Sequence, residues 1–167
     1  MRRVAMVLVC VCVAGFAADF EVSQGVAAGY AHWSGWTGPS VGVFVEPTAS
    51  SGLWGLGLKL SVTIDKVSRR GASESFWPVG ALVEARYSVL DAGLGYACIP
   101  GFTSREGKVA GSANSFAWTV GASFPVVEWD RYQLKMGLHN TVLTALDRFV
   151  NPALVLTLTY RPRTEGR

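Results

Sequence analysis

The chain has 167 residues, of which 50% are hydrophobic and 16% are charged, and its formal net charge at pH 7 is +3. So small a positive excess gives no case for nucleic-acid binding. Beyond the N-terminal segment, no stretch approaches the roughly 18 uninterrupted apolar residues of a membrane-spanning helix. The chain is nonetheless very hydrophobic for a secreted soluble protein.

Residues 1–17 predict a cleavable secretory signal peptide. Two arginines follow the first methionine, residues 4–16 are almost wholly apolar, and small residues precede a cleavage position after Ala17. An apolar run of about 13 residues is too short for the roughly 20 that span a membrane as a helix. Cleavage removes Arg2 and Arg3 and so lowers the net charge from +3 to +1. It also leaves Cys98 without a partner for an internal disulfide.

The mature chain alternates apolar residues with small or polar ones. The stretch 53–65 shows this most clearly, because every second residue from Trp54 to Ile64 is apolar and those between are small, polar or charged. A period of two places the two sets on opposite faces of a strand. The pattern recurs and predicts eight strands, in chain order 20–30, 41–46, 53–65, 77–87, 90–98, 116–126, 132–139 and 153–161.

The connections between these strands also alternate. Short links are expected at 47–52, 88–89 and 127–130, and longer links rich in glycine, serine and charge at 66–75 and 101–114. The link at 34–39 is a short member of the second set. Short turns at one end and longer loops at the other are typical of an outer-membrane barrel with both termini in the periplasm.

Residue size indicates which face meets water, since a soluble lipocalin-like barrel would show the same period. The polar face is mostly Gly, Ala, Ser and Thr, which suits the narrow interior of an eight-stranded barrel rather than a soluble surface. We therefore predict an all-β fold, an eight-stranded antiparallel up-and-down transmembrane β-barrel over residues 18–161. Residues 162–167 would form a short periplasmic tail.

Aromatic residues support this orientation. Those expected near the short-turn end and those expected near the loop end form two sets that bracket an aliphatic band, as membrane interfaces select. We predict an aromatic girdle comprising Phe20, Trp54, Tyr87, Tyr132 and Tyr160 at one end and Tyr30, Trp33, Trp77, Phe116 and Trp118 at the other.

The same orientation places four acids and four bases in the lumen. The hairpin at 88–89 would set Arg86 opposite Asp91, and Lys59 lies on the strand next to Glu84. Charges in a narrow lumen are costly unless paired, so we expect a plug of ion pairs; the alternative is a selective pore. The expected network comprises Glu21, Glu46, Lys59, Glu84, Arg86, Asp91, Lys135 and Arg161.

No catalytic residues are assigned. His32, Asp65 and Ser68 could gather at the outer end of the barrel, as in barrel acyltransferases, but nothing in the local sequence supports this further. The run 139–141 matches a deacylase His-x-Ser only loosely, because Thr141 replaces serine. Cys98 alternates with the lipid-facing set and is read as a small hydrophobe. No metal-ligand spacing and no cofactor motif is present.

A mildly basic exposed surface is expected on the longer loops. It comprises Lys66, Arg69, Arg70, Arg105 and Lys108. Its plain interpretation is solvated loop charge or contact with anionic lipid headgroups, and the alternative is a docking surface for acidic host or extracellular ligands.

The whole mature chain, with its signal peptide, alternating strands, aromatic rings and last strand ending at Tyr160, resembles the small outer-membrane barrels typified by OmpX, Ail, the OmpA membrane domain and OmpW. The resemblance is one of architecture. It implies a location in the outer membrane of a diderm bacterium, contact with outer-membrane lipid and insertion by the barrel-assembly machinery. Because residues 161–167 follow the terminal aromatic, the assembly signal at 154–160 would lie inward of the chain end.

Members of this group act as adhesins, serum-resistance factors, anchors or narrow channels. Since loops on a rigid scaffold usually carry the function, we expect surface loops that serve adhesion, host interaction or envelope protection. A narrow channel for small, apolar molecules is the alternative, and a lipid A-modifying enzyme is a third interpretation.

Overall fold

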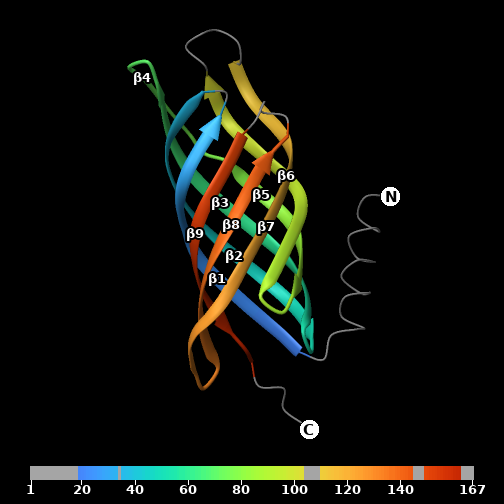
Figure 1. The fold of residues 1–167 in the computed structure, drawn as a ribbon. Coiled ribbons are helices and arrows are strands. Elements are labelled where there is room, and N and C mark those ends of the chain that lie inside the picture. Colours follow the sequence, from blue (N-terminus) through green and yellow to red (C-terminus); the bar gives the residue numbers. More distant parts are fainter. Residues whose placement is uncertain (1–18, 34, 104–109, 145–148, 163–167) are drawn as a thin grey trace, which may run out of the picture.

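The computed structural model describes residues 19–33, 35–103, 110–144 and 149–162 (Figure 1). The predicted signal peptide and all but the first residue of the predicted tail lie outside the described residues. Within this part of the chain, no helix is long and apolar enough to cross a membrane. The described strands are β1 (Asp19–Trp33), β2 (Trp36–Ser51), β3 (Trp54–Arg69), β4 (Ala72–Phe76), β5 (Val79–Tyr87), β6 (Leu90–Thr103), β7 (Ala110–Trp129), β8 (Tyr132–Leu143) and β9 (Phe149–Tyr160).

These strands form one closed antiparallel ring, as predicted. Their order is β2-β1-β9-β8-β7-β6-β5-β3-β4, and β2 also pairs with β3 to close the sheet. Strands β4 and β5 both pair with β3 and are separated only by residues 77–78. They therefore occupy one position in the ring, which gives the eight positions expected from the sequence.

Strand β2 is much longer than the predicted 41–46. It includes Pro39 and Pro47, which had indicated a loop and a turn. Both prolines pair with β1, opposite Tyr30 and Val22. The pairing of β2 with β3 skips residues 38–39 and 46–47 and resumes in the same register. A proline lacks only its N–H, so it interrupts the ladder on one side without ending the strand.

The predicted loop 66–75 is instead a hairpin between β3 and β4. Arg70 and Gly71 form its two-residue turn, with φ of 48° and 82°. Two successive positive φ values are typical of turns that match the twist of the flanking strands. Figure 1 shows this hairpin projecting beyond the neighbouring strands. The two strands continue past the apolar band into the aqueous zone, so many of their residues are polar. These polar residues had led the sequence analysis to predict a loop.

The other links, apart from 88–89, are also tighter than predicted. Residues 52–53, 88–89 and 130–131 each separate two paired strands at the end of the barrel where Asp19 and Arg161 lie, here named the turn end. The hairpin at 88–89 is thus confirmed, whereas 47–52 and 127–130 are mostly strand. At the opposite end, the loop end, β6 and β7 extend into the predicted loop 101–114 and pair as far as Thr103 and Ala110.

Burial is inverted relative to a soluble protein, as the orientation argument predicts. Leu138 and Trp54 are 67% and 63% exposed, whereas Glu84 is 2% exposed. The other buried polar residues include Glu21, Ser23, Ser40, Glu46, Thr48, Lys59, Asp65, Asp91, Thr119, Gln133, Thr157 and Thr159. So large an outward apolar belt is stable in lipid but not in water.

An apolar cluster fills the interior toward the loop end. The sequence analysis had described the inward face as mostly small residues with a few charges, and it had not predicted an apolar layer. Strands β2, β6 and β9 contribute Trp36, Ile99 and Phe149, and Val67 and Phe76 come from the β3–β4 hairpin. Phe76 and Phe149 meet edge to face, with ring centroids 6.0 Å apart. The described interior therefore has an apolar layer near the loop end in addition to the charges.

Candidate functional site

Lys59 and Glu84 form a buried ion pair in the barrel interior. Lys59 Nζ lies 3.1 Å from Glu84 Oε1, and the two side chains are 11% and 2% exposed. The residues come from β3 and β5, which the ring holds side by side. Lys59 Nζ also lies 4.6 Å from the centroid of the Phe44 ring, a cation–π distance. The structure thus brings together two members of the predicted network.

A second group of charges lies at the turn end. Arg86 Nη2 is 3.3 Å from Glu46 Oε1, and Arg86 Nη1 is 4.0 Å from Glu21 Oε2. Arg161 donates from Nε to Glu21 at 3.1 Å and from Nη1 to Glu128 at 2.9 Å. Glu128 was not in the predicted network because its residue number fell in an expected turn. Four strands, β1, β2, β5 and β7, are connected through these contacts.

Asp91 and Lys135 do not make the ion pairs that were expected for them in the lumen network. Arg86 does pair with Asp91 in the register of β5 and β6. The guanidinium nevertheless contacts Glu46 and Glu21, whereas Asp91 Oδ1 lies 3.5 Å from His139 Nδ1. Within the described residues, Lys135 makes no ion pair and lines a cavity at the turn end.

His139 is an interior residue that sequence reasoning did not include in the lumen network. Its ring lies between Asp91, toward Nδ1, and Ser123, whose Oγ is 3.0 Å from His139 Nε2. The signal that could have found this contact set was the alternation itself. It places all three residues on the small, inward face of their strands, β6, β7 and β8.

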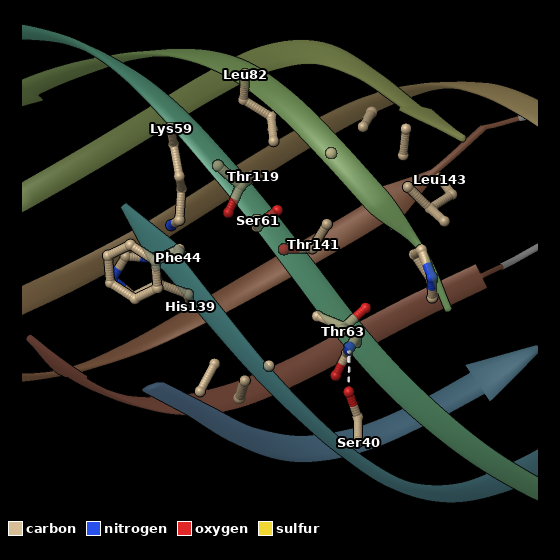
Figure 2. Close-up of a pocket in the computed structure, with 18 of the residues that line it drawn as sticks. Ser40, Phe44, Lys59, Ser61, Thr63, Leu82, Thr119, His139, Thr141 and Leu143 are labelled. Atoms are coloured by element: carbon tan, nitrogen blue, oxygen red, sulfur yellow. Dashed lines mark hydrogen bonds between the residues drawn. The ribbon is translucent and has the colours of Figure 1, made fainter. Parts of the chain in front are cut away.

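Two cavities are found in the interior formed by the described residues. The first, of about 80 Å³, lies between the charged and apolar layers and is lined by Ser and Thr hydroxyl groups together with apolar side chains such as Leu82 and Phe149. Figure 2 shows Lys59 and Phe44 on one side of it and Leu143 on the other. The second, of about 250 Å³, opens at the turn end and is lined by Arg86, Ser123 and Lys135 among others.

The three residues considered for an outer-end catalytic site do not assemble. His32 is exposed, whereas Asp65 is fully buried. The Ser68 hydroxyl donates to the Thr37 backbone carbonyl at 3.4 Å. Asp65 belongs to the inward face of β3, opposite Ser40 on β2, which explains why it is not available at the surface.

Three of the five predicted basic surface residues lie on or beside the β3–β4 hairpin. Lys66 and Arg70 are exposed and Arg69 is partly exposed. Arg69 lies close to the tight turn between β1 and β2, near Gly35. Arg105 and Lys108 lie outside the described residues.

The aromatic residues form outward clusters at each end of the apolar band. At the turn end, Trp54 packs on Tyr87 with centroids 4.6 Å apart, and Tyr132 on Tyr160 at 5.3 Å. Trp129, which was not predicted, stacks on Tyr132. The remaining predicted members that are exposed on the outer surface are Phe20, Tyr30, Trp77 and Phe116, while Trp118 is partly exposed.

Trp33 is a correction to the predicted girdle. It lies on the odd, inward positions of β1 and packs against the apolar interior cluster. Its ring meets Phe76 edge to face, with centroids 6.2 Å apart. Tyr96, 67% exposed, contacts Phe116 and provides an outward aromatic that the sequence analysis had counted only as a strand residue.

Neither a protein-family model nor a curated protein sequence matches this chain. The crystal structure of Ail, the attachment invasion locus protein of Yersinia pestis, in complex with the heparin analogue sucrose octasulfate, matches over 88% of this chain and 100% of that chain, with 14% identity and a TM-score of 0.58. Neisserial surface protein A matches over 86% of this chain and 97% of its own, with 11% identity and a TM-score of 0.58. The chain has the fold of a small outer-membrane β-barrel.

The outer-membrane barrel fold is consistent with the exposed apolar belt, since such barrels turn an apolar band toward lipid. At these identities the likeness concerns the backbone arrangement, so the function of this barrel has to be argued from its own residues.

Proposed function

We propose that this outer-membrane barrel presents its loop end for adhesion, by binding acidic extracellular ligands. The observation that carries the proposal is the projecting β3–β4 hairpin, which holds two exposed cations, Lys66 and Arg70 (Figure 1). Arg70 lies in the turn itself, at the point farthest along the hairpin. A cation at the tip of the hairpin is accessible to a ligand at the loop end.

A sulfated polysaccharide is the ligand class that best fits these cations. Arginine and lysine bind sulfate oxygens through charge-assisted hydrogen bonds. The similar barrel Ail was crystallised with a heparin analogue, sucrose octasulfate. Arg105 and Lys108, in the segment between β6 and β7, would extend the same basic surface.

The alternative role, a narrow conduit for small apolar molecules, is less well supported. The interior holds the Lys59–Glu84 pair, the Arg86 contacts and an apolar layer containing Phe76 and Phe149. We infer that these layers close the lumen, because an eight-stranded barrel is nearly filled by its own side chains. Function would then reside on the surface, with the barrel as an anchor.

The test is binding of the refolded protein in detergent to immobilised heparin. Lys66→Glu combined with Arg70→Glu should weaken binding roughly tenfold, because two exposed ionic contacts of up to about 1 kcal/mol each are lost. Binding of the unsubstituted protein should also weaken as salt is added.

Arg131→Glu is the matched control. Arg131 lies in the turn between β7 and β8 at the turn end, and Arg131→Glu is compared with Arg70→Glu made alone, so that one charge is reversed at each end of the barrel. Arg131→Glu should leave heparin binding unchanged. Equal losses in the two proteins would show that net charge, and not the hairpin, determines heparin binding. Absence of binding by the unsubstituted protein would show that this barrel does not bind heparin.

A further inference from the structure

Three side chains in the interior form a connected series of contacts. Ser123 Oγ lies 3.0 Å from His139 Nε2, and His139 Nδ1 lies 3.5 Å from Asp91 Oδ1. They come from β7, β8 and β6, which are adjacent in the ring. We propose that Ser123, His139 and Asp91 form a serine-hydrolase site that cleaves small, anionic carboxylic esters entering from the turn end.

The strand register makes this contact series possible through a glycine. Gly121 on β7 is the paired neighbour of both Asp91 on β6 and His139 on β8. A Cβ at Gly121 would lie 2.7 Å from Asp91 Oδ1 and 2.8 Å from His139 Cγ. Only a residue without a side chain therefore lets the carboxylate and the imidazole meet across the middle strand.

A second glycine leaves room for the serine. Gly137 on β8 is the paired neighbour of Ser123, and a Cβ there would collide with Ser123 Oγ. The hydroxyl can thus turn toward His139, which is two residues further along β8. A hydroxyl, an imidazole and a carboxylate in this order are the components of a catalytic triad on any fold. Ser123 and His139 are hydrogen-bonded, whereas Asp91 Oδ1 and His139 Nδ1, 3.5 Å apart, have no hydrogen-bond partner among the described residues, so their contact has to tighten when substrate binds.

The serine is accessible, whereas its partners are buried. Ser123 lines the cavity of about 250 Å³ at the turn end, and neither His139 nor Asp91 lines it. The side chains of Asp91 and His139 are 3% and 9% exposed. A substrate in the cavity would therefore reach the nucleophile first, while the base and its carboxylate stay shielded from water.

The same cavity contains cations that favour an anionic substrate. Arg86, Lys135 and Arg161 line it together with Ser123, and they outnumber the one carboxylate of the lining, Glu21. Lys135 has no carboxylate partner in the described part of the chain, so its ammonium group is available to an incoming anion. A cation in this position also stabilises the oxyanion that develops during acyl transfer.

The reaction balances with water as the only co-reactant. Ser123 Oγ forms a bond to the ester carbonyl carbon while its proton passes to His139 Nε2. The carbon–oxygen bond to the alcohol then breaks, and His139 returns the proton to the leaving oxygen. Water attacks the acyl-serine in the same way, which releases the carboxylic acid and restores Ser123. Asp91 acts as a positioning residue, because it orients the imidazole and stabilises its protonated form.

The test uses the refolded barrel in detergent with an alkyl fluorophosphonate and with 4-nitrophenyl acetate and 4-nitrophenyl succinate. The fluorophosphonate should form a phosphorus–oxygen bond to Ser123 with loss of fluoride, located by peptide mass spectrometry. Hydrolysis should favour the anionic succinate ester. Ser123→Ala should abolish labelling and lower the rate at least about a hundredfold.

Two further variants separate catalysis from folding. Ser88→Ala removes another hydroxyl from the same cavity and should retain labelling and hydrolysis. Asp91→Asn should lower kcat about tenfold or more and leave KM unchanged in protein that still shows heat-modifiable migration. Absence of labelling at Ser123 in folded unsubstituted protein, or unchanged hydrolysis in Ser123→Ala, would overturn the proposal.

Discussion

Lys59 and Glu84 occupy neighbouring strands with 3.1 Å between ammonium and carboxylate, and both side chains are almost excluded from solvent. A buried ion pair contributes little net stability, but removal of one partner leaves an uncompensated charge. Thr48 donates a hydrogen bond to the nearby Glu46 at 3.1 Å, which further orders this layer. The Lys59–Glu84 pair and the Arg86 contacts thus give several interior charges an opposite charge as neighbour, whereas the buried carboxylate of Asp65 has no hydrogen-bond partner in the described part of the chain.

Glu84→Gln should lower the free energy of unfolding by about 3–5 kcal/mol, because the Lys59 ammonium loses its counter-charge. Urea unfolding of the barrel in lipid vesicles measures this directly. The double variant Lys59→Met with Glu84→Leu should recover most of the loss, since it removes both charges. If Glu84→Gln alone were as stable as the unsubstituted barrel, the ion pair would not be buried as the structure has it.

The alternation of inward and outward residues along each strand was the most reliable part of the sequence prediction. It placed Glu84, Lys59 and Asp91 inside and Leu138 outside, and the observed burial agrees. Trp33 was wrongly predicted to face outward, because its aromatic character was given more weight than its odd, inward position in β1. The contacts among Ser123, His139 and Asp91 could not be predicted, because they depend on inter-strand register and on the space that Gly121 leaves.

At the scale of elements, the strands are longer and the loops shorter than composition indicated. Glycine, serine and charge are signals for loops only where the chain leaves a sheet. In this barrel β3 and β4 continue beyond the apolar band, so polar residues such as Lys66 and Glu74 lie on paired strands. The apolar layer formed by Phe76 and Phe149 was also missed, because it depends on side chains from distant strands.

The two interior layers should together prevent ion flow. Single-channel recordings in planar bilayers should show no stable open steps, because the ion pairs near the turn end and the aromatic layer near the loop end block the same narrow bore. Regular steps of porin size would contradict the closed lumen and favour the conduit.

At the scale of the whole molecule, one orientation accounts for the ring, the apolar belt and the charged interior. Alternation predicted the number of ring positions because each strand keeps a period of two over most of its length, although register shifts interrupt it near Ile99 and Pro125. It could not predict a ligand, since the proposed adhesion would depend on a few exposed side chains such as Arg70 rather than on a pattern. The central claim is that leucine-rich faces point into lipid.

Spin labels on β9 test that claim most directly. Single cysteines introduced as Leu154→Cys, Val155→Cys, Leu156→Cys and Thr157→Cys, with Cys98→Ser as background, sample both faces of one strand in a lipid bilayer. Labels at 154 and 156 should be accessible to dissolved oxygen, and labels at 155 and 157 should be shielded. The opposite alternation, or a protein that stays in solution without detergent, would contradict the account.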